Sequence, residues 1–251
     1  MDEVKALAKM IDHSLLHPTM TEEDLRKGCA IAKAYDVASV CIKPYAVKLA
    51  VEELAGSDVL VGTVVGFPHG NSTTEIKVAE TVRACQDGAK EIDMVINTGK
   101  ALGGDWAYVK NEIEAICQAT HQDGAILKVI FENDFLPDDA TKIKLCDICS
   151  EVGADFVKTS TGYGFVKGED GKYSYEGATH PDLKLMREHS KPALQVKAAG
   201  GVRTLKDLLA VKALGVTRVG ATATIAMLEE AKKMYGLEAG NMKAQEDVSG
   251  Y

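Results

Sequence analysis

The sequence predicts one domain of the α/β class, folded as a single (β/α)8 TIM barrel over residues 1–251. Three observations lead to this prediction. Short apolar or β-branched runs alternate with amphipathic stretches, the runs number eight, and no proline- or serine-rich linker separates them. Eight strand and helix units spaced by roughly 20 to 40 residues fit a barrel of about 250 residues. A doubly wound parallel sheet is the second choice because it shares the same alternation.

Each element follows from a local pattern. The expected strands are runs of about four to eight residues bounded by turn residues. They cover residues 11–14, 38–43, 60–67, 91–97, 125–131, 156–159, 194–198 and 218–221. Polar starts, periodic apolar faces and glycine stops predict helices between them, for example over 21–36, 74–88 and 204–215. From about residue 240 onward the composition predicts a polar C-terminal tail of the same domain.

Composition argues against several classes of function. The net charge of -8 disfavours nucleic acid as a partner, since duplex binding needs a basic surface. No apolar run approaches the ~20 residues of a membrane span, and the first turns carry acids and lysines, so we expect neither membrane binding nor a signal peptide. Six scattered cysteines are expected to be reduced and packed as small apolar groups, which favours a cytoplasmic protein.

Two lysines lie inside runs that otherwise indicate buried strands. They are Lys158 in DFVKTSTG and Lys197 in ALQVKAAGG. Burying an isolated ammonium costs several kcal/mol or shifts the amine to its neutral form. A neutral lysine is a nucleophile toward carbonyl groups, and a second cation nearby lowers its pKa. The pair therefore predicts Schiff-base chemistry.

Side-chain alternation places further polar residues inside the barrel. Neighbours such as Val157 and Val196 are apolar and would face the helices, so the lysines beside them point inward. Active sites of such barrels lie at the C-terminal ends of the strands. The same alternation brings in Asp12, Cys41, Asp93 and Lys128. Taken alone, Asp12 or Lys128 is explained equally well by a structural ion pair.

Glycines lie at the ends of the last three expected strands. Gly162 lies in STGYG, Gly200 and Gly201 lie in KAAGGVR, and Gly220 comes two residues before Thr222 in RVGATAT. The loops after the last barrel strands commonly bind phosphate through backbone N–H groups. A tight turn also favours glycine without any ligand, but three clusters beside a lysine pair favour a phosphorylated substrate.

The histidines leave a divalent-metal aldolase as an alternative. His13 and His17 lie four residues apart, and His69 and His180 follow other strand or loop ends. However, HSLLHP runs from a strand into a proline turn, and no carboxylate is spaced to complete a site, so we expect no metal. A barrel that binds a sugar phosphate without catalysis would explain the glycines but not Lys158.

Five strings, in the order VGTVVGFPHG, KEIDMVIN, LKVIFE, FVKTSTG and LQVKAAGGVR, resemble the DeoC family of class I aldolases, the deoxyribose-phosphate aldolases. The resemblance covers essentially the whole chain. It implies reversible cleavage of 2-deoxy-D-ribose 5-phosphate to acetaldehyde and D-glyceraldehyde 3-phosphate, with no metal or organic cofactor. It also implies that Lys158 forms the Schiff base, that Lys197 lowers its pKa and that Asp93 relays protons.

Other site residues follow from the same resemblance. Lys128 and Asp12 correspond to supporting residues, and Cys41 corresponds to a cysteine close to the substrate. The expected substrate and phosphate contacts are Thr161, Gly162, Gly200, Gly201, Gly220 and Thr222. A homodimer and a homotetramer are both compatible with the sequence.

Three features bear on how far the family pattern transfers. Residues 163–178 form a longer and more polar segment than the compact glycine turn of the family, which would reshape the mouth of the site. Ala223 stands where relatives commonly carry a serine, so an aldolase with a relaxed phosphate requirement, or with another sugar or aldehyde substrate, is the alternative function. The terminal Tyr251 resembles a tyrosine that reaches the site in some relatives.

Overall fold

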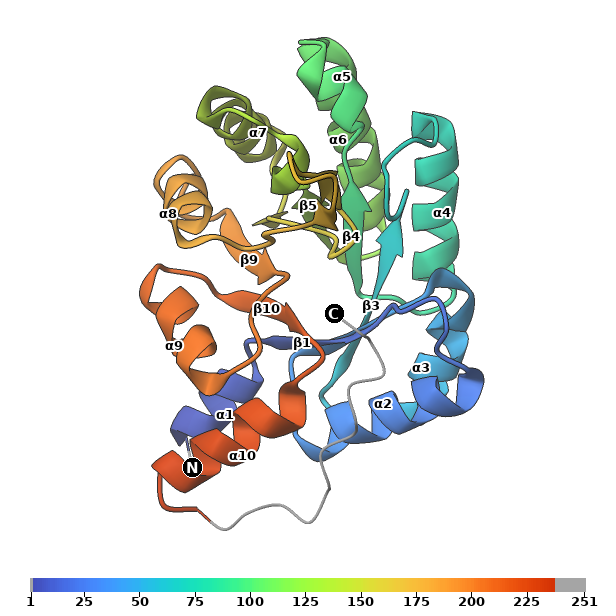
Figure 1. Cartoon of the computed structure of the whole chain (residues 1–251). Helices are drawn as coiled ribbons and strands as arrows, with labels where there is room; N and C mark the ends of the chain where they lie inside the picture. Colours follow the sequence, from blue (N-terminus) through green and yellow to red (C-terminus); the bar gives the residue numbers. More distant parts are fainter. Residues whose placement is uncertain (1, 238–251) are drawn as a thin grey trace.

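Eight parallel strands close into a barrel in this protein. The computed structural model describes residues 2–237. Around the barrel the strands follow the order β1-β10-β9-β6-β5-β4-β3-β2, and helices surround the ring of strands (Figure 1). The predicted TIM barrel is confirmed, and the doubly wound alternative is wrong because the sheet has no open edge. The tail from about residue 240, including Tyr251, lies outside the described residues, so a single domain over 1–251 stays a prediction.

All eight expected strands form, with ends within two residues of the predicted ones. The barrel strands are β1 (Ile11–Leu15), β2 (Ser39–Ile42), β3 (Leu60–Val65), β4 (Glu91–Val95), β5 (Ile126–Ile130), β6 (Phe156–Lys158), β9 (Gln195–Ala199) and β10 (Arg218–Ala221). The run predicted over 60–67 ends early because Gly66 adopts a φ of 62°, outside the β region.

Helices follow the strands in the expected alternation. They are α1 (Asp2–Ala8), α2 (Glu22–Ala34), α3 (Val47–Glu53), α4 (Thr74–Gln86), α5 (Thr98–Leu102), α6 (Trp106–Gln122), α7 (Asp139–Val152), α8 (His180–Glu188), α9 (Leu205–Ala213) and α10 (Thr224–Met234), with 3-10 turns η1 (Pro44–Ala46) and η2 (Asn133–Phe135). Capping boxes, Thr21 with Asp24 and Thr204 with Asp207, begin α2 and α9 and satisfy backbone donors there. No helix within residues 2–237 is long and apolar enough to cross a membrane.

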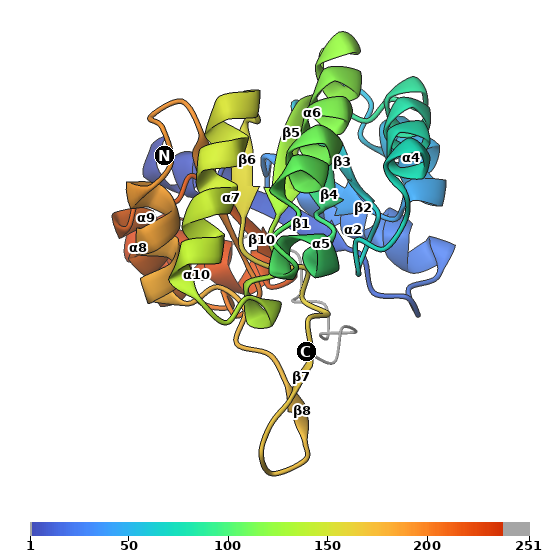
Figure 2. The same ribbon diagram turned by 90° about the horizontal axis from the view of Figure 1, so that it is seen from above.

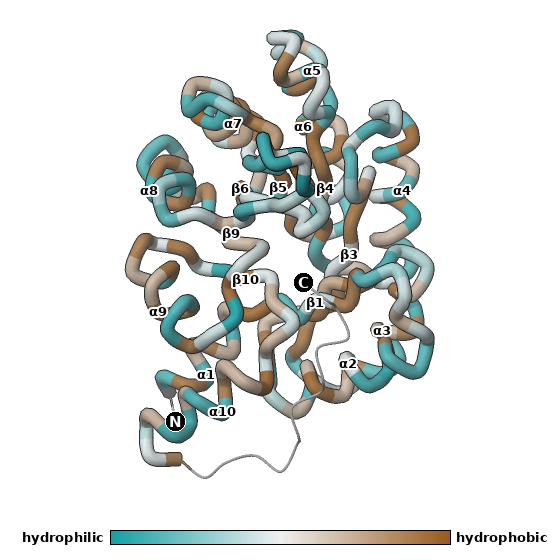
Figure 3. The backbone as a smooth tube through the Cα atoms, viewed as in Figure 1, coloured by the Kyte–Doolittle hydropathy of each residue, from teal (hydrophilic) through white to brown (hydrophobic). Residues whose placement is uncertain are grey.

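The apolar core lies between the strands and the helices. The expected helix-facing residues Val157 and Val196 are fully buried, and so are Met94 and Val129 on neighbouring strands. Hydrophobic colouring follows β3 and β4 in Figure 3, which agrees with strands covered on their outer side by helices. The inner side of the barrel carries charged residues, and strand register sets their height.

Strand register brings these charged residues to neighbouring levels. In the β6 to β9 pairing Lys158 lies opposite Lys197, and in the β9 to β10 pairing Lys197 lies opposite Arg218. In the β4 to β5 pairing Asp93 lies opposite Lys128. Because every strand is parallel, these side chains point inward together and form one cluster.

The segment predicted as a long polar loop contains a hairpin. Antiparallel strands β7 (Val166–Lys167) and β8 (Tyr173–Ser174) form it. The hairpin projects away from the barrel (Figure 2). Two-residue strands are too short for the alternation pattern to reveal them in the sequence.

Candidate active site

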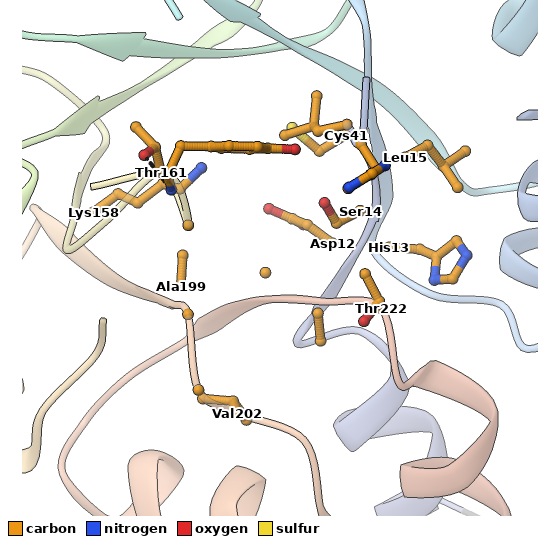
Figure 4. A pocket seen from close by; sticks show the side chains of 18 of the residues that line it. Asp12, His13, Ser14, Leu15, Cys41, Lys158, Thr161, Ala199, Val202 and Thr222 are labelled. Carbon is orange, nitrogen blue, oxygen red and sulfur yellow. Dashed lines mark hydrogen bonds between the residues drawn. The ribbon is translucent and has the colours of Figure 1, made fainter. Parts of the chain in front are cut away.

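A pocket opens at the C-terminal ends of the barrel strands. Its lining includes the predicted residues Asp12, Cys41, Lys158, Thr161, Gly162, Lys197, Gly200, Gly201, Gly220 and Thr222. In Figure 4, Lys158 and Thr161 occupy one side, Ser14 and Cys41 the opposite side, and Ala199, Val202 and Thr222 a third. The two remaining predicted residues, Asp93 and Lys128, lie fully or almost fully buried and contact lining residues.

Asp93 joins three lysines beneath the pocket. Its Oδ2 atom lies 2.8 Å from the Nζ atoms of both Lys158 and Lys197. Its Oδ1 atom lies 2.9 Å from the Nζ atom of Lys128. Asp12 closes the cluster, with Oδ2 at 2.5 Å from Lys197 Nζ and 3.3 Å from Lys128 Nζ. The sequence prediction that these five side chains converge is therefore confirmed as geometry.

Sequence reasoning missed three members of the cluster. Arg218 donates from Nη1 to Asp12 Oδ1 at 2.6 Å and to both carboxylate oxygens of Glu91 at 2.9 Å. Glu91 also accepts from Lys128 at 2.6 Å, and Ser39 donates to Asp12 at 2.7 Å. The signal was present, because Glu91 lies two residues before Asp93 and Arg218 two residues before Gly220, on the same inward faces.

Lys158 is the base with the fewest acidic partners in this cluster. Within residues 2–237 it makes an ion pair with Asp93 only. Lys197 contacts two carboxylates and Arg218 contacts two. Lys128 contacts three. The amine of Lys158 therefore receives the least electrostatic support for its protonated form.

The charges of the cluster balance when Lys158 is neutral. Four basic side chains, Lys128, Lys158, Lys197 and Arg218, face three carboxylates, Asp12, Glu91 and Asp93. Fully ionised, the set would carry one unpaired buried cation, which is costly in a low-dielectric interior. Releasing the proton of Lys158 removes that excess and leaves a nucleophilic amine at the pocket.

The pKa directions agree with this assignment. Burial is the largest influence on Lys158 and lowers its pKa; Asp93 acts in the opposite direction, Lys197 adds to the lowering, and the net pKa is below the ordinary value. Burial also opposes the charged form of Lys197, but Asp12 and Asp93 outweigh it and raise the pKa. Asp93 keeps a pKa well below its usual range, because Lys128, Lys158 and Lys197 outweigh its burial.

Cys41 lies close to these groups but is not ionised. It is 3% exposed and lines the pocket. Burial, assisted by the carboxylate of Asp93, raises the pKa of its thiol to about 11. A thiol in this state is a weak nucleophile near neutral pH, so Cys41 shapes the pocket beside Lys158.

The turns at Gly162, Gly200 and Gly201 line the pocket together with Thr222, and these residues are called its glycine end below. Gly162, Gly200 and Gly201 have φ values of 87°, 83° and 87°, which residues with a side chain rarely adopt. Arg203, an exposed residue that the sequence reasoning passed over, also lines the pocket. The pocket thus combines a guanidinium and a hydroxyl with three loop ends from neighbouring strands.

The histidines do not form a metal site among the described residues. His13 is buried and its Nδ1 lies 2.8 Å from Thr224 Oγ1, while His17 Nδ1 lies 2.6 Å from Thr19 Oγ1. Burial lowers the pKa of His13 to about 4. Within residues 2–237 no three His, Cys, Asp or Glu side chains are placed to hold a metal ion together.

Comparison with known proteins identifies the family. The sequence matches the DeoC/LacD family of aldolases over residues 6–232. The chain belongs to this family. A deoxyribose-phosphate aldolase from Rhodopirellula baltica is 52% identical over 245 residues, which cover 98% of this chain and 97% of that protein. One from Thermococcus gammatolerans is 45% identical over 90% of this chain and 96% of that protein.

A solved structure of a DeoC-type aldolase has the same fold. The deoxyribose phosphate aldolase from Aeropyrum pernix, described as a unique tetrameric structure, superposes with a TM-score of 0.80 and 30% identity. The match covers 93% of this chain and 94% of that chain. The family resemblance seen in the sequence motifs is therefore confirmed, as is the barrel.

Proposed function

We propose that this DeoC family member reversibly cleaves 2-deoxy-D-ribose 5-phosphate to acetaldehyde and D-glyceraldehyde 3-phosphate through a Schiff base on Lys158. The observation that carries the proposal is the position of Lys158 as the surplus base of a buried cluster, with its amine at the pocket. A lysine that is neutral in the resting state can attack an aldehyde. The choice of substrate in this proposal is based on the relatives named above, which are deoxyribose-phosphate aldolases.

The cluster accounts for each step of cleavage. Neutral Lys158 adds to C1 of the open-chain aldehyde, and loss of water gives a protonated imine that accepts electrons as the C2–C3 bond breaks. Asp93 lies 2.8 Å from the reacting nitrogen, so its carboxylate stabilises the iminium charge and, through a water, passes protons between intermediates. Lys197 stays protonated, held by Asp12 and Asp93.

The glycine end of the pocket is the proposed phosphate site. The turns at Gly162, Gly200 and Gly201 would offer backbone donors to an anion, and Arg203 would offer a countercharge. Gly220, which lies inside β10 and not in a turn, and Thr222 line the same pocket. Ala223, whose side chain has no hydroxyl, leaves this end one donor short of the family pattern. A Schiff-base aldolase with a weaker phosphate requirement is therefore the second candidate function.

Borohydride trapping tests the proposal. The protein is incubated with acetaldehyde and borohydride, and peptide mass mapping locates the reduced adduct. We expect the label on Lys158, and we expect Lys158→Ala and Lys158→Arg to be unlabelled and nearly inactive, since a guanidinium stays protonated. Label on Lys197 or Lys128, or activity that chelator abolishes while borohydride has no effect, would contradict the assignment.

Assembly and location complete the proposal. We propose that the enzyme is a homo-oligomer, a dimer or tetramer, because the Aeropyrum pernix relative is described as tetrameric. We also propose a cytoplasmic location, in keeping with the six cysteines, all of which are free thiols. Light scattering at several protein concentrations measures the first, and fractionation of the source cells measures the second.

A further inference from the structure

We infer that Tyr175, at the base of the β7 to β8 hairpin, determines specificity for the phosphate-bearing end of the substrate, and that Asp134 is the residue that positions it. The inference rests on the proposed function, because it concerns which end of a sugar phosphate the pocket holds. The segment between β6 and α8, which contains Tyr175, is attached to the barrel at both of its ends.

Both ends of this segment are fixed by carboxylates from one loop. Glu132, which follows β5, is 1% exposed and accepts from the backbone N–H of Thr161 at 3.2 Å and also from the Thr161 hydroxyl. Asp134, two residues later, accepts from the backbone N–H groups of Glu176 at 2.5 Å and Gly177 at 3.1 Å. Hydrogen bonds therefore fix the segment where it leaves the barrel, at Thr161, and where it returns, at Glu176 and Gly177.

Close backbone contact fixes the same two points. A Cβ atom on Gly164 would lie 2.6 Å from Cδ of Glu132, and a Cβ atom on Gly177 would lie 2.9 Å from the carbonyl carbon of Gly200. The N–H of Ala178 donates to the carbonyl of Gly200 at 3.1 Å. The returning strand thus packs directly on the turn after β9, which is one of the proposed phosphate turns.

Tyr175 lies at that junction. It lines the pocket, and its Cε2 atom is 3.2 Å from the position that a Cβ atom on Gly200 would occupy. The ring of Phe165, from the outgoing side of the hairpin, packs edge to face against it, with centroids 5.2 Å apart and planes at 84°. Tyr175 is therefore held from two sides, with its ring against the Gly200 turn.

A ring in this position affects phosphate more than the rest of the substrate. Because the ring packs against the Gly200 turn, it should keep water away from the backbone donors there, and hydrogen bonds to an anion strengthen when water is excluded. The reacting end of the pocket, at Lys158, is formed by other residues. Removing the ring should therefore weaken binding of a phosphorylated sugar and leave an unphosphorylated one nearly unaffected.

Asp134 acts on the substrate through Tyr175. Its two backbone hydrogen bonds are made to the residues that directly follow Tyr175 in the chain. Asp134 is absent from the pocket lining. Loss of its carboxylate should release the returning strand and give the same kinetic pattern as loss of the Tyr175 ring.

Steady-state kinetics with paired substrates test both assignments. For Tyr175→Ala we expect KM for 2-deoxyribose 5-phosphate to rise about tenfold, with kcat and the kcat/KM for 2-deoxyribose each changed less than about twofold. Tyr175→Phe should behave like the wild type, because the ring carries the effect. Tyr173→Ala is the matched control, since Tyr173 lies two residues earlier on the same hairpin, is 67% exposed and does not line the pocket.

The Asp134 variants are judged by the substrate ratio, which is kcat/KM for 2-deoxyribose 5-phosphate divided by kcat/KM for 2-deoxyribose. Asp134→Ala should raise KM for the phosphorylated sugar as Tyr175→Ala does. Asp134→Asn should keep most of the affinity, because its amide oxygen still accepts a backbone hydrogen bond. The double variant Asp134→Ala with Tyr175→Ala should lose no more affinity than either single variant. Thermal unfolding and borohydride trapping with acetaldehyde are measured for every variant. Equal losses on both substrates, additive losses, or a Tyr173→Ala effect as large as that of Tyr175→Ala would overturn the inference.

Borohydride trapping distinguishes failure of the role of Tyr175 from failure of the proposed function. If acetaldehyde labels Lys158 in all Tyr175 and Asp134 variants while their substrate ratio stays that of the wild type, the role inferred for Tyr175 is wrong and the proposed function stands. If the wild type itself is not labelled, the proposed function fails and the inference fails with it.

Discussion

At the scale of single residues, the number of ionic partners distinguishes Lys158 from its neighbours. A lysine pKa is set by the balance of burial, which favours the neutral amine, and carboxylates, which favour the ammonium. Lys158 has one acidic partner and Lys197 has two. The same buried environment therefore lowers the pKa of Lys158 and raises the pKa of Lys197, and the pH dependence of the reaction tests the difference.

Replacing Lys197 should move the pH dependence of the reaction upward. Lys197 contributes to the lowered pKa of Lys158, after burial, so Lys197→Leu should raise that pKa. Because the neutral amine reacts, the acid limb of the kcat/KM profile should shift to higher pH and activity at neutral pH should fall. Lys184→Leu, at an exposed lysine of α8, is the control. An acid limb at its original pH would mean that burial alone tunes Lys158.

Replacing Glu91 should shift the acid limb of the kcat/KM profile to lower pH. Glu91→Gln removes one of the three carboxylates and leaves Lys128 and Arg218 with more uncompensated charge, which disfavours protonation of Lys158. Breaking this buried ion pair should also lower the free energy of unfolding by about 3 kcal/mol. Denaturant titration and the kcat/KM profile measure the two effects. A limb that moves upward would show that the cluster does not act as one charge balance.

At the scale of elements, the phosphate end depends on how α10 begins. Its N-cap residue, Ala223, has φ -81° and ψ 32° and makes no side-chain capping bond. A serine at an N-cap stabilises a helix best when the backbone is extended, and the backbone here is not. A hydroxyl placed at Ala223 would therefore remain available to a bound anion.

Ala223→Ser should strengthen the phosphate preference with little effect on stability. We expect KM for 2-deoxyribose 5-phosphate to fall by up to about fivefold, equivalent to ~1 kcal/mol for a new hydrogen bond to a charged group. Kinetics with the phosphorylated and unphosphorylated sugars measure it, and Ala223→Val, without a hydroxyl, is the control. Should both sugars gain equally, the hydroxyl would be acting on the sugar and not on the phosphate.

At the scale of the whole molecule, the charged centre of the barrel couples stability to acid. The pKa values of Asp12 and Asp93 are held below their ordinary range because neighbouring cations outweigh burial. A carboxylate whose folded pKa is lowered contributes stability above its unfolded pKa of about 4, and the contribution is lost as pH falls below that value. Glu132 has the opposite sign, because burial raises its pKa.

The free energy of unfolding should therefore fall steeply between about pH 4 and pH 2 and vary little between about pH 5 and pH 7. Asp93→Asn removes one of the two carboxylates whose pKa is lowered, so the variant should be less stable at neutral pH and lose less stability on acidification. Denaturant titrations at a series of pH values measure both. If the wild type and Asp93→Asn lost equal stability on acidification, the acid sensitivity would have to come from carboxylates outside the cluster.

Local pattern determined the barrel and five of the seven charged side chains at its centre. Alternation along each strand is a short-range property, so the sequence alone placed Asp93, Lys158 and Lys197 on inward faces and predicted a reactive amine. It also located the strands to within two residues. The hairpin at 166–174 was not predicted, because strands of two residues carry no periodic signal.

Only the tertiary structure decided which base has the lowered pKa. That outcome depends on Arg218 and Glu91, which lie on strands far apart in the sequence, and on the register that brings them to the level of Asp12. The positions of Tyr175 and Asp134 likewise depend on the packing of one loop on another. The face on which a strand residue lies follows from its neighbours in the sequence. A charge balance and a contact between loops depend on segments that are far apart in the sequence, and the closed barrel brings those segments together.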